Sequence, residues 1–242
     1  MLSFWKKLAR SLCSKLRFTI ILKLYCSILL ITVLNCLFGS AEKNLKITNF
    51  IIYVLPPFLI SKLNYMTTYK TFDTERLILK PTDIDDAEFI IEIYNTPKWI
   101  RFIGERNVKT KENAVEYIEK KILPQLKRLG YSNYTLLLKA NHQKIGICGL
   151  FDREGLEGID IGFAFLPEFE KKGYGFESAS KLMTIAFDEF GINEINAITD
   201  KDNISSQKLL EKLGLELTGT TKLSAEDEEV LLYKAKLNAN KI

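Results

Sequence analysis

The stretch DIGFAFLPEFEKKGYG, residues 160–175, decides which fold is expected for this 242-residue chain. Its first half alternates apolar residues and predicts a strand, and Gly173 and Gly175 mark a turn into a helix. A helix that starts at a glycine turn presents backbone N–H groups without partners, and its dipole adds partial positive charge there. Lys171 and Lys172 add full positive charges. The pattern suits a diphosphate, although a tight turn with two solvated lysines accounts for it equally well.

Further strands and helices alternate on both sides of this stretch. Asp83 is a good N-cap for a helix that Pro97 ends, and Thr110 and Gly130 bound a second helix that Pro124 should kink. The expected strands are 76–80, 134–140, 144–151, 158–166, 194–199, 215–218 and 229–237, and the later helices are 174–190 and 203–213. This order predicts an α/β fold, a mixed sheet with helices on both faces.

Charge and cysteines are unevenly distributed along the chain. Residues 1–65 hold nine Lys/Arg and one acid, a net charge of +8, so the remainder has a net charge of −4. The expected folded part is therefore mildly acidic, which argues against a nucleic-acid binder. Cys148 is the one cysteine after residue 65, and its apolar surroundings predict a buried thiol. The single histidine, His142, lies in a predicted hairpin turn, so no metal site is expected.

The first 65 residues form an apolar, basic leader with three interpretations. The segment from Phe18 to Phe38 carries one charge over 21 residues, which is long enough to span a bilayer with its basic end on the cytoplasmic side. A secretion signal cleaved near Gly39 is the second interpretation. In the third, which we favour, translation begins at Met66 and the native protein is cytoplasmic without the leader. An inner-membrane anchor is the main alternative.

Several spaced motifs occur in a fixed order along the remainder. TERLIL (74–79) and DDAE (85–88) come first, followed by DIGF (160–163), PEFEKKGYGFESA (167–179), DKDNISS (200–206) and LEKLGL (210–215). Together they resemble the GNAT superfamily of N-acetyltransferases, and within it the ribosomal-protein N-terminal acetyltransferases. The similarity covers residues 71–238. It implies a mixed, mostly antiparallel sheet and transfer of an acetyl group from acetyl-coenzyme A to an amine.

The resemblance also implies cofactor contacts position by position. Phe165 and Leu166 match the strand whose backbone pairs with pantetheine amides. Asn203 matches a pantetheine contact, although it is also an ordinary helix N-cap, and Ser206 matches a small residue facing the cofactor. The residues that match the pyrophosphate loop are Lys171, Lys172, Gly173, Tyr174, Gly175 and Phe176.

Two loop positions depart from the superfamily pattern. Glu170 stands where a Gln or Arg is usual, and a carboxylate there disfavours a phosphate unless it points outward. Lys171 stands where a glycine is usual, and it would be strained if the loop needs a positive φ. Both departures would weaken cofactor binding.

Catalysis requires a neutral amine, so a base is expected near the thioester. Asp160 matches the superfamily's strand glutamate and is the candidate, although an edge or solvated carboxylate accounts for it too. Many relatives carry a general-acid tyrosine where this chain has Leu210, which leaves Ser206 as the possible substitute. The acceptor is expected at Trp99, Arg101 and Phe102, where core packing is the alternative for the two aromatic residues.

We therefore expect a metal-independent enzyme that uses acetyl-coenzyme A and acts by direct attack. The acceptor would be a protein N-terminus or a small-molecule amine, and the enzyme a monomer or a homodimer. One alternative is a coenzyme A-binding module without activity, which would release no thiol with any amine. The other is a membrane-tethered acyltransferase, which requires the leader.

Overall fold

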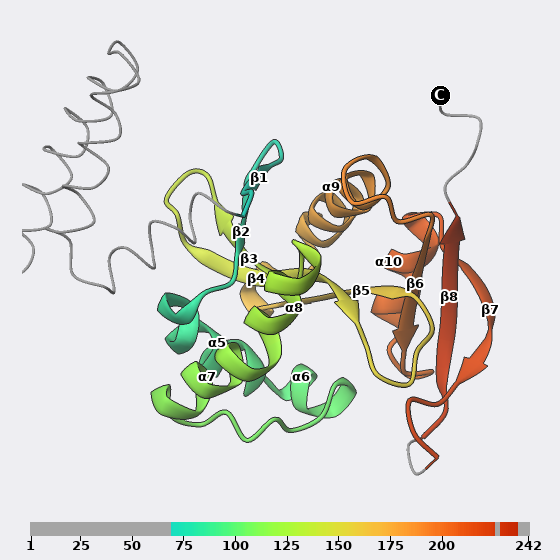
Figure 1. The fold of residues 1–242 in the computed structure, drawn as a ribbon, viewed down its shortest axis with the longest axis horizontal. Coiled ribbons are helices and arrows are strands. Elements are labelled where there is room, and N and C mark those ends of the chain that lie inside the picture. Colours follow the sequence, from blue (N-terminus) through green and yellow to red (C-terminus); the bar gives the residue numbers. More distant parts are fainter. Residues whose placement is uncertain (1–68, 226–227, 237–242) are drawn as a thin grey trace, which may run out of the picture. The chain divides into compact units, whose positions relative to one another are not determined.

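A computed structural model describes residues 69–225 and 228–236 (Figure 1). The described residues all belong to one compact unit, Thr68–Ile242. The leader and its three interpretations lie outside the described residues. Within the described ranges, no helix combines the length and the apolar character that crossing a bilayer requires.

The described strands form one sheet of eight in the order β1-β2-β3-β4-β5-β6-β8-β7. Neighbouring strands run antiparallel, except for the parallel pair β5 and β6. The predicted hairpin is confirmed as β3 and β4. The bounds are β1 Phe72–Asp73, β2 Leu77–Pro81, β3 Asn133–Leu138, β4 Lys144–Asp152, β5 Ile159–Phe165, β6 Glu194–Thr199, β7 Glu216–Thr221 and β8 Val230–Lys236.

Helices cover both faces of this sheet. Successive residues of β5 point to opposite faces, so they show which helices pack on each face. Phe163 and Phe165 pack into the core cluster that contains the buried residues of α9 Tyr174–Asp188 and of α10 Ile204–Lys212. Ala164 and Leu166 pack into the other cluster. That cluster contains α5 Ala87–Tyr94, α6 Pro97–Phe102, α7 Lys111–Tyr117 and the π turn η2 Ile118–Ile122. Figure 1 shows α5, α6 and α7 grouped on one side, away from α9. The predicted α/β fold is confirmed.

The helix predicted for residues 111–129 is divided into three parts. α7 is followed by η2 and then by α8 Leu123–Leu129, which ends at Gly130 with a φ of 83°. Pro124 explains the division. It has no N–H for the preceding turn and its ring crowds the carbonyl four residues back, so the chain widens into a π turn.

Pro97 begins a helix, where the sequence analysis took it only as a stop. α5 ends at Tyr94, and α6 starts at Pro97, where a missing N–H is harmless because the first turn has no acceptor for it. Thr96 caps α6 by accepting a hydrogen bond from the N–H of Trp99. α6 therefore has a fixed start, and two residues separate it from α5.

A buried carboxylate fastens the start of α5 to the sheet. Asp83 caps the 3₁₀ turn η1 Ile84–Asp86 that precedes α5, in a capping box with Asp86. The fully buried Asp86 carboxylate lies 2.8 Å from Lys80 Nζ and 2.6 Å from Lys144 Nζ. Burial alone would raise the pKa of Asp86, but the two ammonium groups hold it below its ordinary value. These contacts join β2 and β4 to the first helices.

The loop between β5 and α9 contains two left-handed residues. It starts with the 3₁₀ turn η3 Pro167–Phe169, and it continues through Lys171, with φ 57°, and Gly173, with φ 85°. Glycine tolerates this conformation, whereas Lys171 carries a Cβ that costs about 1 kcal/mol there. The departure from glycine noted in the sequence thus falls at a position with a positive φ.

We expect Asp86→Asn to lower the free energy of unfolding by about 3 kcal/mol, because two ammonium groups would then face a buried neutral amide. Since the folded pKa of Asp86 is lowered, its contribution is present above its ordinary pKa of 3.8 and is lost as the pH falls through the folded value. Urea titrations at several pH values should show that the difference in free energy of unfolding between wild type and variant becomes smaller below pH 3.8. A difference independent of pH would contradict this. The control is Lys120→Met, which breaks an exposed ion pair with Glu116 and should change the free energy of unfolding little.

Lys171→Gly should raise the free energy of unfolding by about 0.5 kcal/mol. It removes left-handed strain of about 1 kcal/mol and loses part of that gain to the greater freedom of the unfolded chain. Lys172→Gly removes the same charge from a neighbour whose φ is not positive, so it should lower stability instead. Denaturant midpoints of both variants measure this. If both move in the same direction, Lys171 carries no strain.

Candidate functional site

The sheet opens between its two parallel strands. β5 and β6 pair only at Ile159 with Ile195 and at Asp160 with Asn196, although the strands continue to Phe165 and Thr199. Beyond those pairs β5 is bonded to β4 alone, and β6 to β8 alone. Part of β5 therefore has a free backbone edge in the middle of the sheet.

The register of β4 and β5 determines which residues present that edge. Phe165 lies opposite Gly146, and the N–H of Leu166 donates to the carbonyl of Ile145, so Phe165 is in a non-hydrogen-bonded pair. Its own N–H and C=O therefore point away from β4, into the opening, and so do those of Phe163 two residues earlier. Leu166 is different: its N–H is bonded to Ile145, and its carbonyl accepts from Phe169. Of the two predicted pantetheine contacts, Phe165 has a free backbone and Leu166 does not, and Phe163, which the sequence did not single out, has a free backbone as well.

A row of backbone N–H groups follows at the start of α9. In the described chain, no acceptor faces the N–H groups of residues 171–176, and the first to find one is that of Glu177, which bonds to the carbonyl of Gly173. Gly173 occupies the N-cap and supplies no side chain. The helix dipole places partial positive charge at the same point. All the N–H groups of the predicted pyrophosphate loop are therefore without an acceptor in the described part of the chain.

An arginine that the sequence analysis did not single out supports this loop. The Arg76 guanidinium lies 4.4 Å from the ring centroid of Tyr174, and its Nη1 donates to the carbonyl of Lys172 at 3.1 Å. Its Nε donates to Glu177, which also accepts from Thr74 Oγ1. Burial alone would raise the pKa of Glu177, but these hydrogen bonds and the Arg76 charge hold it below its ordinary value. The turn between β1 and β2 is therefore fastened to α9.

The charged side chains of the loop lie in two settings. Lys171 and Lys172 are exposed, and Lys172 Nζ lies 5.3 Å from the ring centroid of Phe169. Glu170, the other departure from the superfamily pattern, is paired with Lys98 of α6 at 2.6 Å. The lysines thus remain open to solvent, whereas the carboxylate has a cationic partner.

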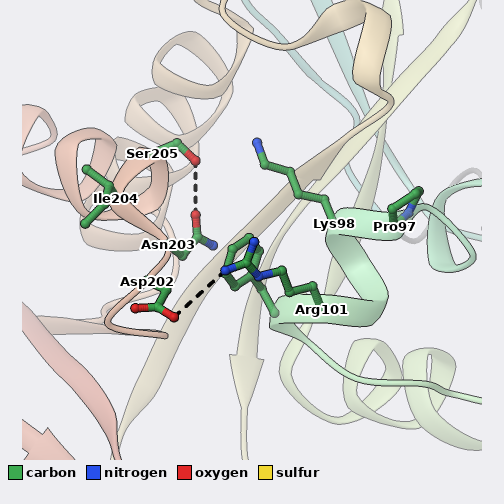
Figure 2. Close-up of a pocket in the computed structure, with 8 residues that line it drawn as sticks. Pro97, Lys98, Arg101, Asp202, Asn203, Ile204 and Ser205 are labelled. Carbon is green, nitrogen blue, oxygen red and sulfur yellow. Dashed lines mark hydrogen bonds and ion pairs between the residues drawn. The ribbon is translucent and has the colours of Figure 1, made fainter.

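A pocket of about 410 Å³ lies between α6 and the start of α10 (Figure 2). Arg101 and Phe102 line it from α6, and Asn203 lines it from α10. In Figure 2, Arg101 extends toward Asp202, and the two charged groups are 3.9 Å apart. Asn203 caps α10, since its Oδ1 accepts from the N–H of Ser206. Two predicted acceptor residues and one predicted cofactor residue thus share one pocket.

The remaining predicted residues lie outside this pocket. Trp99 is 7% exposed and stacks on Tyr94, with ring centroids 3.9 Å apart, so we remove it from the acceptor contacts. Its place in α6 directs its ring into the core, which was the alternative left open. Ser206 is half-buried and does not line the pocket. Leu210, at the tyrosine position of relatives, is buried in the core and offers no acid.

Asp160 lies where β5 and β6 separate. Its side chain is 2% exposed, and Arg153 Nη2 and Nε contact its carboxylate at 3.0–3.3 Å. Burial raises the pKa of Asp160 above its ordinary value, and Arg153 opposes that shift. Asp160 is therefore neither solvated nor at a sheet edge. The sequence analysis missed Arg153, which comes from the turn before β5.

The other reactive side chains in the described part of the chain form no second centre. Cys148 is buried as predicted, and burial raises the pKa of its thiol to about 12, so it is protonated at neutral pH. His142 is exposed in the β3–β4 turn. Across residues 69–225 and 228–236, no three His, Cys, Asp or Glu side chains gather as metal ligands would.

Residues 76–216 match the family model of the acetyltransferase (GNAT) domain. The chain is 26% identical over 152 residues to the "uncharacterized N-acetyltransferase YoaA" of Bacillus subtilis (strain 168), which covers 62% of this chain and 85% of that protein. Its fold matches a ribosomal-protein-S5-alanine acetyltransferase from Vibrio fischeri, with a TM-score of 0.59 and 18% identity over 69% of this chain and 96% of that one. It also matches RimL, a ribosomal L7/L12 α-N-protein acetyltransferase in complex with coenzyme A, with a TM-score of 0.56 and 18% identity over 71% and 100%. Because the family model spans more than half of the chain, this protein belongs to the GNAT acetyltransferase family and is an acyltransferase.

Proposed function

We propose that this acetyltransferase binds acetyl-coenzyme A with its diphosphate on residues 171–176 and passes the acetyl group directly to a primary amine. One observation carries the proposal, the row of N–H groups at the start of α9 that no acceptor in the described chain satisfies. A diphosphate supplies acceptors of the matching charge, and the exposed Lys171 and Lys172 add to the attraction.

The free edge of β5 suits the pantetheine arm. Pantetheine is extended and contains two amides, so it can lie along Phe165 and Phe163 as an added strand would. From the loop it would run back toward Asp160, where β5 and β6 separate. Asn203 uses its Oδ1 to cap α10, which leaves its Nδ2 for the cofactor. Ser206, one turn further along α10, is the small residue proposed to face the cofactor.

The acceptor amine would enter through the pocket between α6 and α10. Arg101 and Phe102 offer a charge and an apolar surface there, and Asp202 offers a carboxylate. An α-amino group at a protein N-terminus, as in the ribosomal-protein acetyltransferase branch, and a small-molecule amine both fit an open, mixed surface of this kind. Arg101 would then hold an acidic group of the acceptor.

The transfer itself needs one bond made and one broken. The amine nitrogen attacks the thioester carbonyl carbon, the carbon–sulfur bond breaks, and the thiolate leaves. The amine gives up a proton, and we propose that Asp160 takes it, directly or through a water molecule. Burial raises the pKa of Asp160, which makes it a better base than an exposed carboxylate. A backbone N–H of β5 would polarise the carbonyl oxygen.

Calorimetry with coenzyme A tests the binding site. Gly173→Ala places a Cβ at φ 85° and 3.2 Å from Arg76 Nη2, so the loop must shift and the Kd should rise about tenfold. Gly191→Ala is the matched control, because it also has a positive φ but meets nothing within 4 Å. It should lower stability without changing the Kd. A wild type that ignores coenzyme A at millimolar concentration would sink the proposal.

A thiol-release screen over peptides, polyamines and aminoglycosides identifies the acceptor, and Asp160→Asn then tests the base. We expect kcat to fall by about 100-fold while the Kd for coenzyme A stays unchanged. The wild-type rate should fall on the acid side as Asp160 gains a proton, and the variant should lack that dependence. Arg153→Gln serves as the comparison. An equal loss of kcat in both variants would mean that the ion pair, and not the base, is what matters.

A further inference from the structure

The loop that we propose for the diphosphate starts with a negative charge. Glu170 directly precedes the free N–H groups of residues 171–176, and it stands where the superfamily pattern has a Gln or an Arg. A carboxylate so close to a bound diphosphate repels it and opposes the partial positive charge of α9. The chain must therefore bind an anion beside a residue of the same charge.

Lys98 supplies the missing positive charge from a distant part of the sequence. Its Nζ lies 2.6 Å from Glu170 Oε2, although the two residues are 72 positions apart. The Glu170 side chain is 23% exposed and that of Lys98 is 44% exposed, so the pair is partly screened from solvent. Of the charged loop residues, only Glu170 is engaged in this way, because Lys171 and Lys172 are exposed and make no ion pair in the described chain.

The backbone of Lys98 is firmly placed. Lys98 is the second residue of α6, between Pro97 and the buried Trp99, and Thr96 caps the helix start. The ring of Trp99 stacks on Tyr94 of α5. Because α6 is anchored in this way, the backbone that carries the Lys98 side chain is placed within reach of Glu170 before any ligand arrives.

We propose that Lys98 is a positioning residue for the cofactor: by pairing with Glu170 it removes the negative charge from the entrance of the diphosphate loop. This rests on the proposed function, since it concerns the same loop. It also assigns α6 two tasks. Lys98, Arg101 and Phe102 of α6 all line the pocket proposed for the acceptor, and Lys98 also pairs with Glu170 on the cofactor side.

A double-mutant cycle measured by calorimetry with coenzyme A tests the proposal. Lys98→Met should raise the Kd about five- to tenfold, because Glu170 is left unpaired. Glu170→Gln alone should leave the Kd equal to that of wild type or lower it. The double variant Lys98→Met/Glu170→Gln should return to within about twofold of wild type, because the charge that needed a partner is gone. A loss of structure around α6 would not be repaired by the second change.

Two controls separate the pairing of Lys98 with Glu170 from a loss of net positive charge and from a contact with the 3′-phosphate. Lys120→Met removes the same net charge from an exposed pair with Glu116 and should leave the Kd unchanged. Dephospho-coenzyme A keeps the diphosphate but lacks the 3′-phosphate, so Lys98→Met should weaken both ligands by the same factor. A loss confined to coenzyme A would overturn the proposal, since Lys98 would then act on the 3′-phosphate.

The failures of the two proposals look different. If wild type binds coenzyme A but Lys98→Met binds it equally well, or the double variant stays as weak as Lys98→Met, only the role of Lys98 is wrong. If wild type binds no coenzyme A at millimolar concentration, the proposed function fails and the role of Lys98 fails with it.

Discussion

The site depends on the short parallel ladder between β5 and β6. Two residue pairs, Ile159 with Ile195 and Asp160 with Asn196, hold the strands together, and beyond them the strands separate. An unpaired strand edge inside a sheet is unusual, because backbone donors and acceptors are normally satisfied. Here the edge belongs to β5, which is followed along the chain by the loop to the start of α9 and its unpaired N–H groups. In the proposed function, the free edge takes the extended part of the ligand and the N–H groups take its charged end.

The opening is maintained by contacts that are not part of the ladder. At its closed end, the buried ion pair between Asp160 and Arg153 holds the turn before β5 against the sheet. Asn196 of β6 donates from its Nδ2 to the carbonyl of Glu157 in the same turn. At its other end, Phe165 Cε2 and Leu209 Cδ2 lie 3.4 Å and 2.9 Å from where a Cβ on Gly175 would stand. A side chain at Gly175 would push α9 and α10 apart, so the spacing between the N–H groups and Asn203 depends on this glycine.

The general features of this fold could be predicted from the sequence because they depend on local residue patterns. Apolar alternation located the strands, the order of the motifs identified the superfamily, and Gly173 marked the start of α9. The sequence did not show that the backbone of Leu166 is already hydrogen-bonded, because hydrogen-bond direction depends on register, and no local pattern gives the register of Phe165 with Gly146.

Contacts between distant residues were also beyond the sequence. Lys98 and Glu170 are 72 positions apart, and no local sequence pattern around either residue predicts that they pair. The burial of Trp99 depends on how α6 packs on α5, and the sequence analysis had no α6 at all. In the sequence, the one sign of α6 is the pair Thr96-Pro97, which is typical of a capped helix start as well as of a helix end. A local signal of this kind leaves both outcomes open until the neighbouring helix is placed.

The clamp of Arg76, Thr74 and Glu177 has a consequence for how folding and binding are linked. The turn between β1 and β2 contains none of the residues proposed for the site, yet it holds the start of α9 through Glu177 and the carbonyl of Lys172. Any local opening of this outermost hairpin would release the helix start. A ligand bound there would in turn favour the closed hairpin by mass action. Protection of the β1–β2 hairpin from proteases and from hydrogen exchange would then increase with the fraction of molecules that have a ligand bound at the start of α9.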